Sequence, residues 1–515
     1  MRLFSTLKNR SKEDGILFLM LFCLFLIAIY FPLFYHLDYL PIRLYDEARR
    51  AVNALEMAHN WNFIVTYYDG EPDMWGKPPL PIWFMAISMH LFGFDELGLR
   101  LPSALTGLGV VLTLVYFSKK YLQDYSLGLI AGLILVTSGG FIREHVVRTA
   151  DYDVYLCLWT LLYTLSFFLY TEASDEAKRR KYLYASAAFI TLAVLTKSVA
   201  GLFFVPGMAV FALVRGKVGQ LLRSRHSYFA LMGILFFVGG YYLLRNHLTP
   251  YYINTVMHNE VTGRFFNAMQ GHDHGPFFYA ENIFNYHFHP WIYLLFPGII
   301  LGLAQKGKLG RLSILLVLNC LILFSVISFS KTQLSWYDAP LFPLFAVLTA
   351  IPLNLLFQRL AGVKSIPNWK NFSLGTLFLL TLFAIPYFKT FQTIYKPERN
   401  WKQHEKELYG YYIRNHPNLD HYFVCNIGYN AASKFYIDNL NRRGYTIGRF
   451  HPLKTQPPEA ILLICEQEAK KTIREVHHIY PLMEWKRCEL IKVTGNKRDY
   501  QVNVKELEEN KKAKE

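Results

Sequence analysis

Long apolar runs separated by short charged loops fill the chain as far as residue 388. The first uncharged run, 16–35, is long enough to cross the hydrocarbon core of a bilayer. Further runs follow at 97–117, 125–142, 154–170, 182–196, 199–214, 227–244, 291–304, 312–329, 341–357 and 372–388. The pattern predicts an all-α polytopic membrane bundle of about eleven transmembrane helices.

After residue 388 the apolar content drops and the charge density rises. Short strand-like runs at 421–426, 460–465 and 490–493 lie between helical segments, which favours a small α/β domain. The predicted organisation is therefore a transmembrane domain followed by a soluble extracytoplasmic domain, with bounds 1–388 and 389–515.

The C-terminal region also carries three cysteines, Cys425, Cys465 and Cys488, without zinc-like spacing. One disulfide is compatible with this set, since three cysteines cannot all pair within the chain. From Lys505 onward the sequence is a run of charges, which predicts a frayed helix or a disordered end.

The formal net charge of +16 raises the question of a nucleic-acid partner. The basic residues, however, gather in alternate loops between apolar runs, beginning with the segment before the first run. Under the positive-inside rule these loops and the N-terminus are cytoplasmic, and the first run is a retained signal anchor. The other loops then face outward and hold most of the acids and histidines, so we expect no nucleic-acid partner.

The first outward loop carries ionisable groups at two points. Asp46 and Glu47 begin a helix-like segment, 46–59, in which Arg49 follows them, and Lys77 stands before two prolines. One interpretation of the acidic pair is structural, because carboxylates in a first turn interact favourably with the helix dipole. The other is catalytic, with a carboxylate that moves a proton and cations that pair with the acids or bind phosphate.

The second outward loop holds Asp151 and Asp153 near Arg143 and Arg148. One interpretation is structural pairing with these arginines, since an uncompensated carboxylate at the start of a membrane helix is costly. The other is that carboxylates of two outward loops cooperate, one taking a proton and one orienting the base. Lys197, at the outer end of a tight hairpin, either extends to the membrane interface or contacts phosphate.

The fourth outward loop is rich in polar groups, among them His258, Arg264 and His274. Clustered histidines raise the question of a metal site. Their spacing is not the His-Glu-x-x-His pattern and no cysteine joins them, so we do not expect a metal ion. A later outward loop adds a phenol, Tyr337.

These segments resemble bacterial members of the dolichyl-phosphate-mannose protein mannosyltransferase superfamily, especially the lipid A aminoarabinose transferase branch. The lysine with tandem prolines after an acidic pair is the most specific part of the resemblance, and the C-terminal region adds no specific match. The matching segments follow the family order at 46–49, 77–83, 100–104, 148–153, 195–197, 274–279, 290–291 and 330–343.

The resemblance implies the GT-C fold, a transmembrane helical bundle with active-site loops on the non-cytoplasmic side. It implies Asp46 as the catalytic carboxylate, with Asp151 or Asp153 as the acid of the second loop. It also implies that Lys77 contacts the donor phosphate, aided by Arg49 and Tyr337.

One position departs from the aminoarabinose branch. That branch has a glutamate directly before the lysine, and the glutamate takes part in a metal site; here the position is Gly76. Lys77, Arg49 and Arg264 suffice to neutralise one phosphate, so we expect no metal cofactor.

Residues and resemblance together lead us to expect a multi-pass glycosyltransferase of the bacterial inner membrane, with its active site facing the periplasm. A monosaccharide would pass from a polyprenyl-phosphate donor to a hydroxyl of a lipid A-like lipid or of a protein. The main alternative is a transporter or flippase, although such proteins usually show repeated halves and ionisable groups near the bilayer midplane. A weaker alternative is a membrane scaffold.

Overall fold

The computed structural model describes residues 19, 22–143, 145–267, 271–361, 369–395, 397, 399–416, 418–453 and 459–497. The chain forms two compact units. The membrane unit comprises Met1–Leu37 and Glu56–Pro397, and the tail unit comprises Asp38–Leu55 and Glu398–Glu515. The basic N-terminal segment and the charged end from Lys505, both singled out above, lie outside the described residues.

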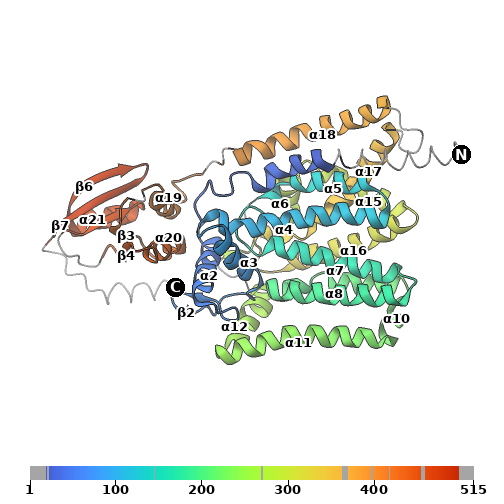
Figure 1. The fold of residues 1–515 in the computed structure, drawn as a ribbon, viewed down its shortest axis with the longest axis horizontal. Helices are drawn as coiled ribbons and strands as arrows, with labels where there is room; N and C mark the ends of the chain where they lie inside the picture. Colours follow the sequence, from blue (N-terminus) through green and yellow to red (C-terminus); the bar gives the residue numbers. More distant parts are fainter. Residues whose placement is uncertain are drawn as a thin grey trace. The chain divides into compact units, whose positions relative to one another are not determined.

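The membrane unit is a helical bundle in which α4, α7 and α8 run side by side (Figure 1). Among the described residues, seven helices are long and apolar enough to cross a membrane, or eight if a pair bent by 107° counts as one span. The seven are α4 with η1 (Glu96–Leu122), α7 (Asp153–Glu172), α8 with η2 (Glu176–Leu202), α11 (Arg225–Leu248), α16 (Lys308–Phe329), α17 (Leu341–Leu360) and most of α18 (Ser373–Tyr395 of Trp369–Tyr395).

Several apolar runs form helices that are too short to count as spans by length alone. They are Phe22–Phe34, α3 (Leu80–Phe92), α5 (Tyr125–Val136) and α9 (Val205–Val214), and the bent pair joins Phe278–His287 to α15 (Ile292–Ala304). The predicted polytopic all-α bundle is confirmed, whereas the number of about eleven spans stays a prediction.

Small residues bring helices of the bundle into backbone contact. A Cβ at Gly128 of α5 would lie 2.7 Å from the Val115 Cα of α4, and one at Gly298 of α15 would lie 2.2 Å from the Leu348 carbonyl of α17. Only glycine permits these approaches, as is common where membrane helices pack. The close packing fixes the helix ends from which the loops extend.

The first outward loop contains more structure than its sequence pattern predicts. Helix α2 (Asp46–Asn60) agrees with the predicted segment, but α3 was not predicted. Helix α3 begins directly after the tandem prolines, and Pro81 lies in its first turn, where proline needs no donor. Between α2 and α3, two short strands, β1 (Tyr67–Tyr68) and β2 (Glu71–Pro72), pair as an antiparallel hairpin.

The tail unit contains a mixed five-stranded sheet in the order β4-β3-β5-β7-β6. Strand β3 pairs in parallel with β4 and β5, while β7 pairs antiparallel with β5 and β6. The strands are β3 (His421–Cys425), β4 (Thr446–Phe450), β5 (Ile461–Ile464), β6 (His477–Trp485) and β7 (Cys488–Asn496), and the helices are α19 (Leu408–Asn415), α20 (Ala431–Asn441) and α21 (Gln467–Val476).

The predicted α/β character of the tail is confirmed, as are the three strand-like runs, which became β3, β5 and β7. Strands β4 and β6 were missed. The sheet buries an apolar core, and a disulfide joins Cys465 at the end of β5 to Cys488 at the start of β7. Cys425 is buried and free, so one disulfide forms among the three cysteines.

Candidate functional site

A partly buried carboxylate in the membrane unit connects two of the predicted phosphate-binding cations. Glu260 lies on η3 (Met257–Gly263), with its Oε2 3.4 Å from Lys77 Nζ and its Oε1 3.4 Å from Arg264 Nε. Burial alone would raise the pKa of Glu260, but the Lys77 and Arg264 cations outweigh it and hold the pKa below its ordinary value. Glu260 is therefore an anion at neutral pH.

The same network continues through Tyr337 to a second ion pair. Arg264 donates to the Tyr337 hydroxyl at 2.5 Å, and Lys197 Nζ lies 5.0 Å from the centre of the Tyr337 ring. Lys197, the last residue of α8, also lies 2.5 Å from Oδ1 of Asp153, the first residue of α7. Burial raises the pKa of Tyr337, so the phenol keeps its proton and can donate it in a hydrogen bond.

These groups line a cavity of about 160 Å³. Its walls combine charged and apolar side chains, an arrangement suited to a ligand with one anionic and one apolar part. Lining residues from the polar set are Lys77, Asp153, Lys197, Glu260, Arg264 and Tyr337, and those from the apolar set include Val199, Phe203, Phe265, Val326, Ile327 and Pro340.

Two buried side chains hold the loop that carries Lys77. Tyr252 donates to the Gly76 carbonyl at 3.0 Å, and Arg245 donates to the Asp73 carbonyl at 3.1 Å. The Arg245 guanidinium also lies 4.5 Å from the centre of the Tyr252 ring. The backbone before Lys77 is therefore fixed from one side, while two prolines restrict it on the other.

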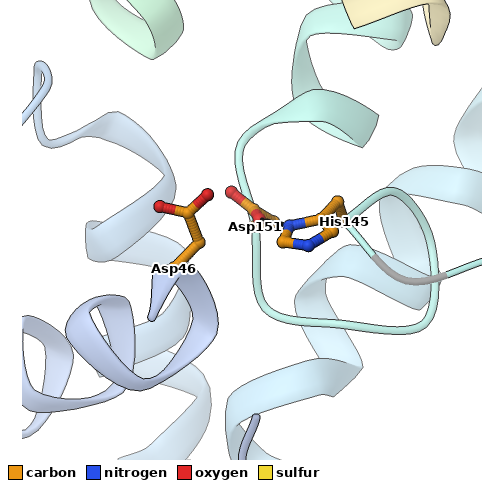
Figure 2. Close-up of side chains that lie close together, drawn as sticks. All are labelled: Asp46, His145 and Asp151. Carbon is orange, nitrogen blue, oxygen red and sulfur yellow. Dashed lines mark hydrogen bonds and ion pairs between the residues drawn. The ribbon is translucent and has the colours of Figure 1, made fainter. Parts of the chain in front are cut away.

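The second outward loop forms a separate pair, His145 with Asp151 (Figure 2). His145 Nδ1 lies 2.8 Å from Asp151 Oδ2, and the imidazole stacks on Trp336 at 3.6 Å between ring centres. The backbone of His145 is left-handed, with φ of 67°, and its N–H donates to the Thr149 hydroxyl at 2.6 Å. Sequence reasoning missed His145; its place six residues before Asp151 in a short charged loop was the available signal.

The predicted alternative, in which Asp151 and Asp153 pair with Arg143 or Arg148, is wrong. Asp151 pairs with His145, and Asp153 pairs with Lys197. Arg148 instead donates to the carbonyls of Pro32 and Tyr35 at 2.9 and 2.7 Å, and burial lowers its pKa to about 10. Lys197 does not extend to an interface but lies buried in the cavity wall.

The acidic pair of the first loop lies in the tail unit, at the start of α2 (Figure 2). Asp46 Oδ1 lies 3.2 Å from Arg50 Nη1, so the predicted pairing of an acid with an arginine occurs one turn along the helix. Glu47 is buried and accepts a hydrogen bond from the Arg43 N–H at 2.9 Å, which fixes the turn into α2. Arg49, half-buried, follows on the same helix.

The two candidate histidines of the fourth loop are exposed. His258 lies on η3, and the His274 ring stacks on Phe278 at 4.4 Å while its N–H donates to Gln333 at 2.9 Å. Within the described part of the chain neither histidine is among the residues that line the cavity. Glu260, which the sequence analysis did not single out, connects Lys77 and Arg264 and is the central residue of this loop.

Comparison with known proteins shows what the chain is similar to. Residues 76–242 match the family model of dolichyl-phosphate-mannose-protein mannosyltransferases. An uncharacterized protein of Aquifex aeolicus is 28% identical over 377 residues, 73% of this chain and 71% of that protein. An undecaprenyl phosphate-alpha-4-amino-4-deoxy-L-arabinose arabinosyl transferase of Pseudomonas savastanoi pv. phaseolicola is 28% identical over 216 residues, 41% of this chain but only 38% of that transferase.

The crystal structure of ArnT from Cupriavidus metallidurans bound to undecaprenyl phosphate superposes with a TM-score of 0.70 at 15% identity, covering 92% of this chain and 97% of that one. Part of the chain, residues 76–242, is thus similar to dolichyl-phosphate-mannose-protein mannosyltransferases. Its fold is the GT-C fold seen in that ArnT structure, and it is a multi-pass membrane protein.

The glycine before Lys77 has a structural reason. A Cβ at Gly76 would lie 2.6 Å from the Thr66 hydroxyl and 3.2 Å from the Asp73 carbonyl. The glutamate that the aminoarabinose branch has at this position therefore does not fit here without displacing the loop.

Proposed function

We propose that this protein transfers a monosaccharide from a polyprenyl-phosphate donor to a hydroxyl group of a lipid or a protein. The match of residues 76–242 to the mannosyltransferase family model and the GT-C fold support the reaction class. The observation that carries the proposal for the site is the cavity in which Lys77, Lys197 and Arg264 converge.

The charge balance of this cavity favours an anionic ligand. Three cations face two carboxylates there, Asp153 and Glu260, so the group has one positive charge in excess. The Glu260 carboxylate stands between Lys77 and Arg264, and phosphate oxygens accept charge-assisted hydrogen bonds from the same donors. We place the donor phosphate against Lys77 and Arg264, where it competes with Glu260 for the two cations.

The polar and apolar groups of the cavity serve different parts of the reaction. Negative charge grows on the phosphate as the glycosidic bond breaks, so Lys77 and Arg264 stabilise the departing polyprenyl phosphate in the transition state. Tyr337 can donate a hydrogen bond to the same oxygens, and the Asp153–Lys197 pair holds Lys197 against the phenol ring. The apolar wall suits the first isoprene units.

We assign the proton transfer to Asp46. Its carboxylate takes the proton of the acceptor hydroxyl as the oxygen attacks the anomeric carbon, and a single displacement inverts that centre. Asp151, oriented by His145, serves as the acid of the second loop. Because the phosphate is both leaving group and anchor, the reaction as proposed uses no nucleotide and no metal ion.

The proposed location is the bacterial inner membrane, with the active site on the periplasmic face. Basic residues in alternate loops support this orientation. A further support is the disulfide between Cys465 and Cys488, since disulfides persist in the periplasm and are rare in the cytosol.

The test incubates purified protein with radiolabelled polyprenyl-phosphate pentose or mannose and a membrane extract. We expect label in a lipid or protein acceptor, and the labelled fraction identifies the acceptor class. Asp46→Asn should lower turnover by about 10²–10⁴, the usual contribution of general base catalysis, while the protein still accumulates in the membrane. Turnover above about half of normal would leave Asp46 with its helix-start role alone.

A second arm of the same assay tests the metal expectation. Activity should survive prolonged treatment with EDTA. Loss of activity that returns on addition of zinc would contradict the proposal and assign a metal to the site.

A further inference from the structure

The segment that leads into Asp46 is held by the tail unit, to which it belongs. The N–H of Ile42, a fully buried residue, donates to the Tyr436 hydroxyl of α20 at 2.9 Å. Two residues later, the N–H of Leu44 donates to Glu407 Oε1 at 3.1 Å. Both contacts are made to backbone groups, so they fix the path of the chain rather than the packing of one side chain.

The same segment is held at its start by Arg414 of α19. Its guanidinium donates to the carbonyls of Asp38 and Tyr39 at 2.6 and 2.9 Å. The backbone of residues 38–45 thus forms hydrogen bonds with three side chains of the C-terminal part of the chain, Glu407, Arg414 and Tyr436.

Tyr45, the residue before Asp46, has a left-handed backbone with φ of 70°. A non-glycine residue in this region is conformationally costly, and such residues persist only where their surroundings impose them. The Tyr45 ring is 68% exposed and stacks on Tyr429 with 7° between the planes. Because burial contributes little here, the contacts made by Leu44 and the stacking on Tyr429 are what impose the turn.

The acceptor of the Leu44 N–H is itself rigidly placed. Glu407 is buried and forms a two-pronged ion pair with Arg399, whose Nε and Nη2 lie 2.8 and 2.6 Å from Oε2. A buried carboxylate satisfied in this way has little freedom to move.

We infer that the C-terminal domain positions the catalytic carboxylate of Asp46. Tyr436 and Glu407 hold the backbone of residues 42–44. Tyr45 then turns the chain so that Asp46 starts α2 in a fixed direction. This inference rests on the proposed role of Asp46. It makes Tyr436 a positioning residue, since its hydroxyl acts on Asp46 only through the Ile42 N–H.

The experiment compares Tyr436→Phe with Tyr409→Phe in the full-length protein. Tyr409 is a matched control, because its buried hydroxyl donates at 2.5 Å to the Cys425 carbonyl inside the tail sheet. Each variant is examined for amide hydrogen exchange in residues 38–46, for kcat and for donor KM. The assay uses undecaprenyl-phosphate-linked sugar.

In Tyr436→Phe we expect the rate of hydrogen exchange at the Ile42 amide to rise roughly fivefold. Loss of one ordinary hydrogen bond increases the population of the open state by about this factor. We expect kcat to fall by a similar factor and donor KM to stay unchanged, since the proposed donor contacts, Lys77 and Arg264, belong to the membrane unit. Tyr409→Phe should lower the thermal stability of the tail and leave kcat unchanged. Faster exchange with unaltered kcat would overturn the inference.

A double variant separates this inference from the proposed function. In an Asp46→Asn background, Tyr436→Phe should have no further effect on the residual turnover, because the hydroxyl acts through Asp46. An equal loss in both backgrounds would show that Tyr436 acts by another route and overturn the inference. Normal turnover of Asp46→Asn alone would instead refute the proposed function.

Discussion

The two ends of helix α7 carry ion pairs of very different character. Its first residue, Asp153, meets Lys197 in the cavity wall, where their side chains are 1% and 6% exposed. Its last residue, Glu172, meets Arg215 and Arg311, whose side chains are 26% and 31% exposed. Water and salt therefore screen the charges around Glu172 more than those of the buried Asp153–Lys197 pair.

The difference shows which ion pairs are available to a ligand. Both oxygens of Glu172 are bound by arginines, Oε1 by Arg215 and Arg311 and Oε2 by Arg311. Asp153 Oδ2, by contrast, is buried with no hydrogen-bond partner among the described residues. A buried polar atom in that state is costly, and Asp153 Oδ2 can therefore accept a hydrogen bond from a group that enters the cavity.

In this comparison of the two ends of α7, we expect the largest effect on turnover from a substitution at Asp153. Asp153→Asn leaves Lys197 buried without its counter-ion, and we expect turnover to fall by about 10²–10³, as on loss of one preorganised group. Glu172→Gln removes the equivalent charge at the other end and should leave turnover unchanged. Equal losses of turnover in the two variants, measured at matched expression, would remove the distinction between the two ends.

A second, smaller effect concerns donor affinity. Lys77→Ala should weaken binding of undecaprenyl phosphate about 10–100-fold, because one charge-assisted hydrogen bond to phosphate is lost. Arg311→Ala is the control at the opposite end of the unit and should bind as the unaltered protein does. If Lys77→Ala changes only the affinity for the acceptor, the phosphate is not at this cavity.

The sequence predicted those parts of the structure that local patterns determine. Apolar runs and capping acids predicted the bundle and α2, and Lys197 was a candidate because it is a lone charge in an apolar region. Strand β6 was missed because Pro481 and a row of exposed residues break its alternation. The GT-C fold itself came from the resemblance.

Glu260 and His145 show why the site was only partly predictable. Glu260 lies in a loop with many polar residues, and its role depends on Lys77 and Arg264, of which Lys77 is remote in sequence. His145 is defined by stacking on Trp336, another distant residue. Contacts of this kind follow from the tertiary fold and leave no local periodicity or motif.

The smallest effect tests whether Glu260 competes with the donor phosphate. If it does, Glu260→Gln removes an anion from between Lys77 and Arg264 and should tighten binding of undecaprenyl phosphate severalfold, the range of a single partly screened charge pair. Glu281→Gln, on α14 (Phe278–Asn282), is a control of the same chemistry and should not change donor affinity.

The competition between Glu260 and the donor phosphate also predicts how donor affinity depends on pH. The neighbouring cations hold the pKa of Glu260 below its ordinary value, so its carboxylate stabilises the fold above that ordinary range and loses this contribution as the pH falls through the lowered pKa. Protonation of Glu260 also frees both cations, so donor affinity should rise as the pH falls into that acidic range, with proton uptake on binding. In Glu260→Gln this pH dependence should vanish.

Calorimetry in buffers of different ionisation enthalpy measures the proton uptake on donor binding. Equal proton uptake in Glu260→Gln would show that another group titrates. Glu260 would then only hold Lys77 and Arg264 in place.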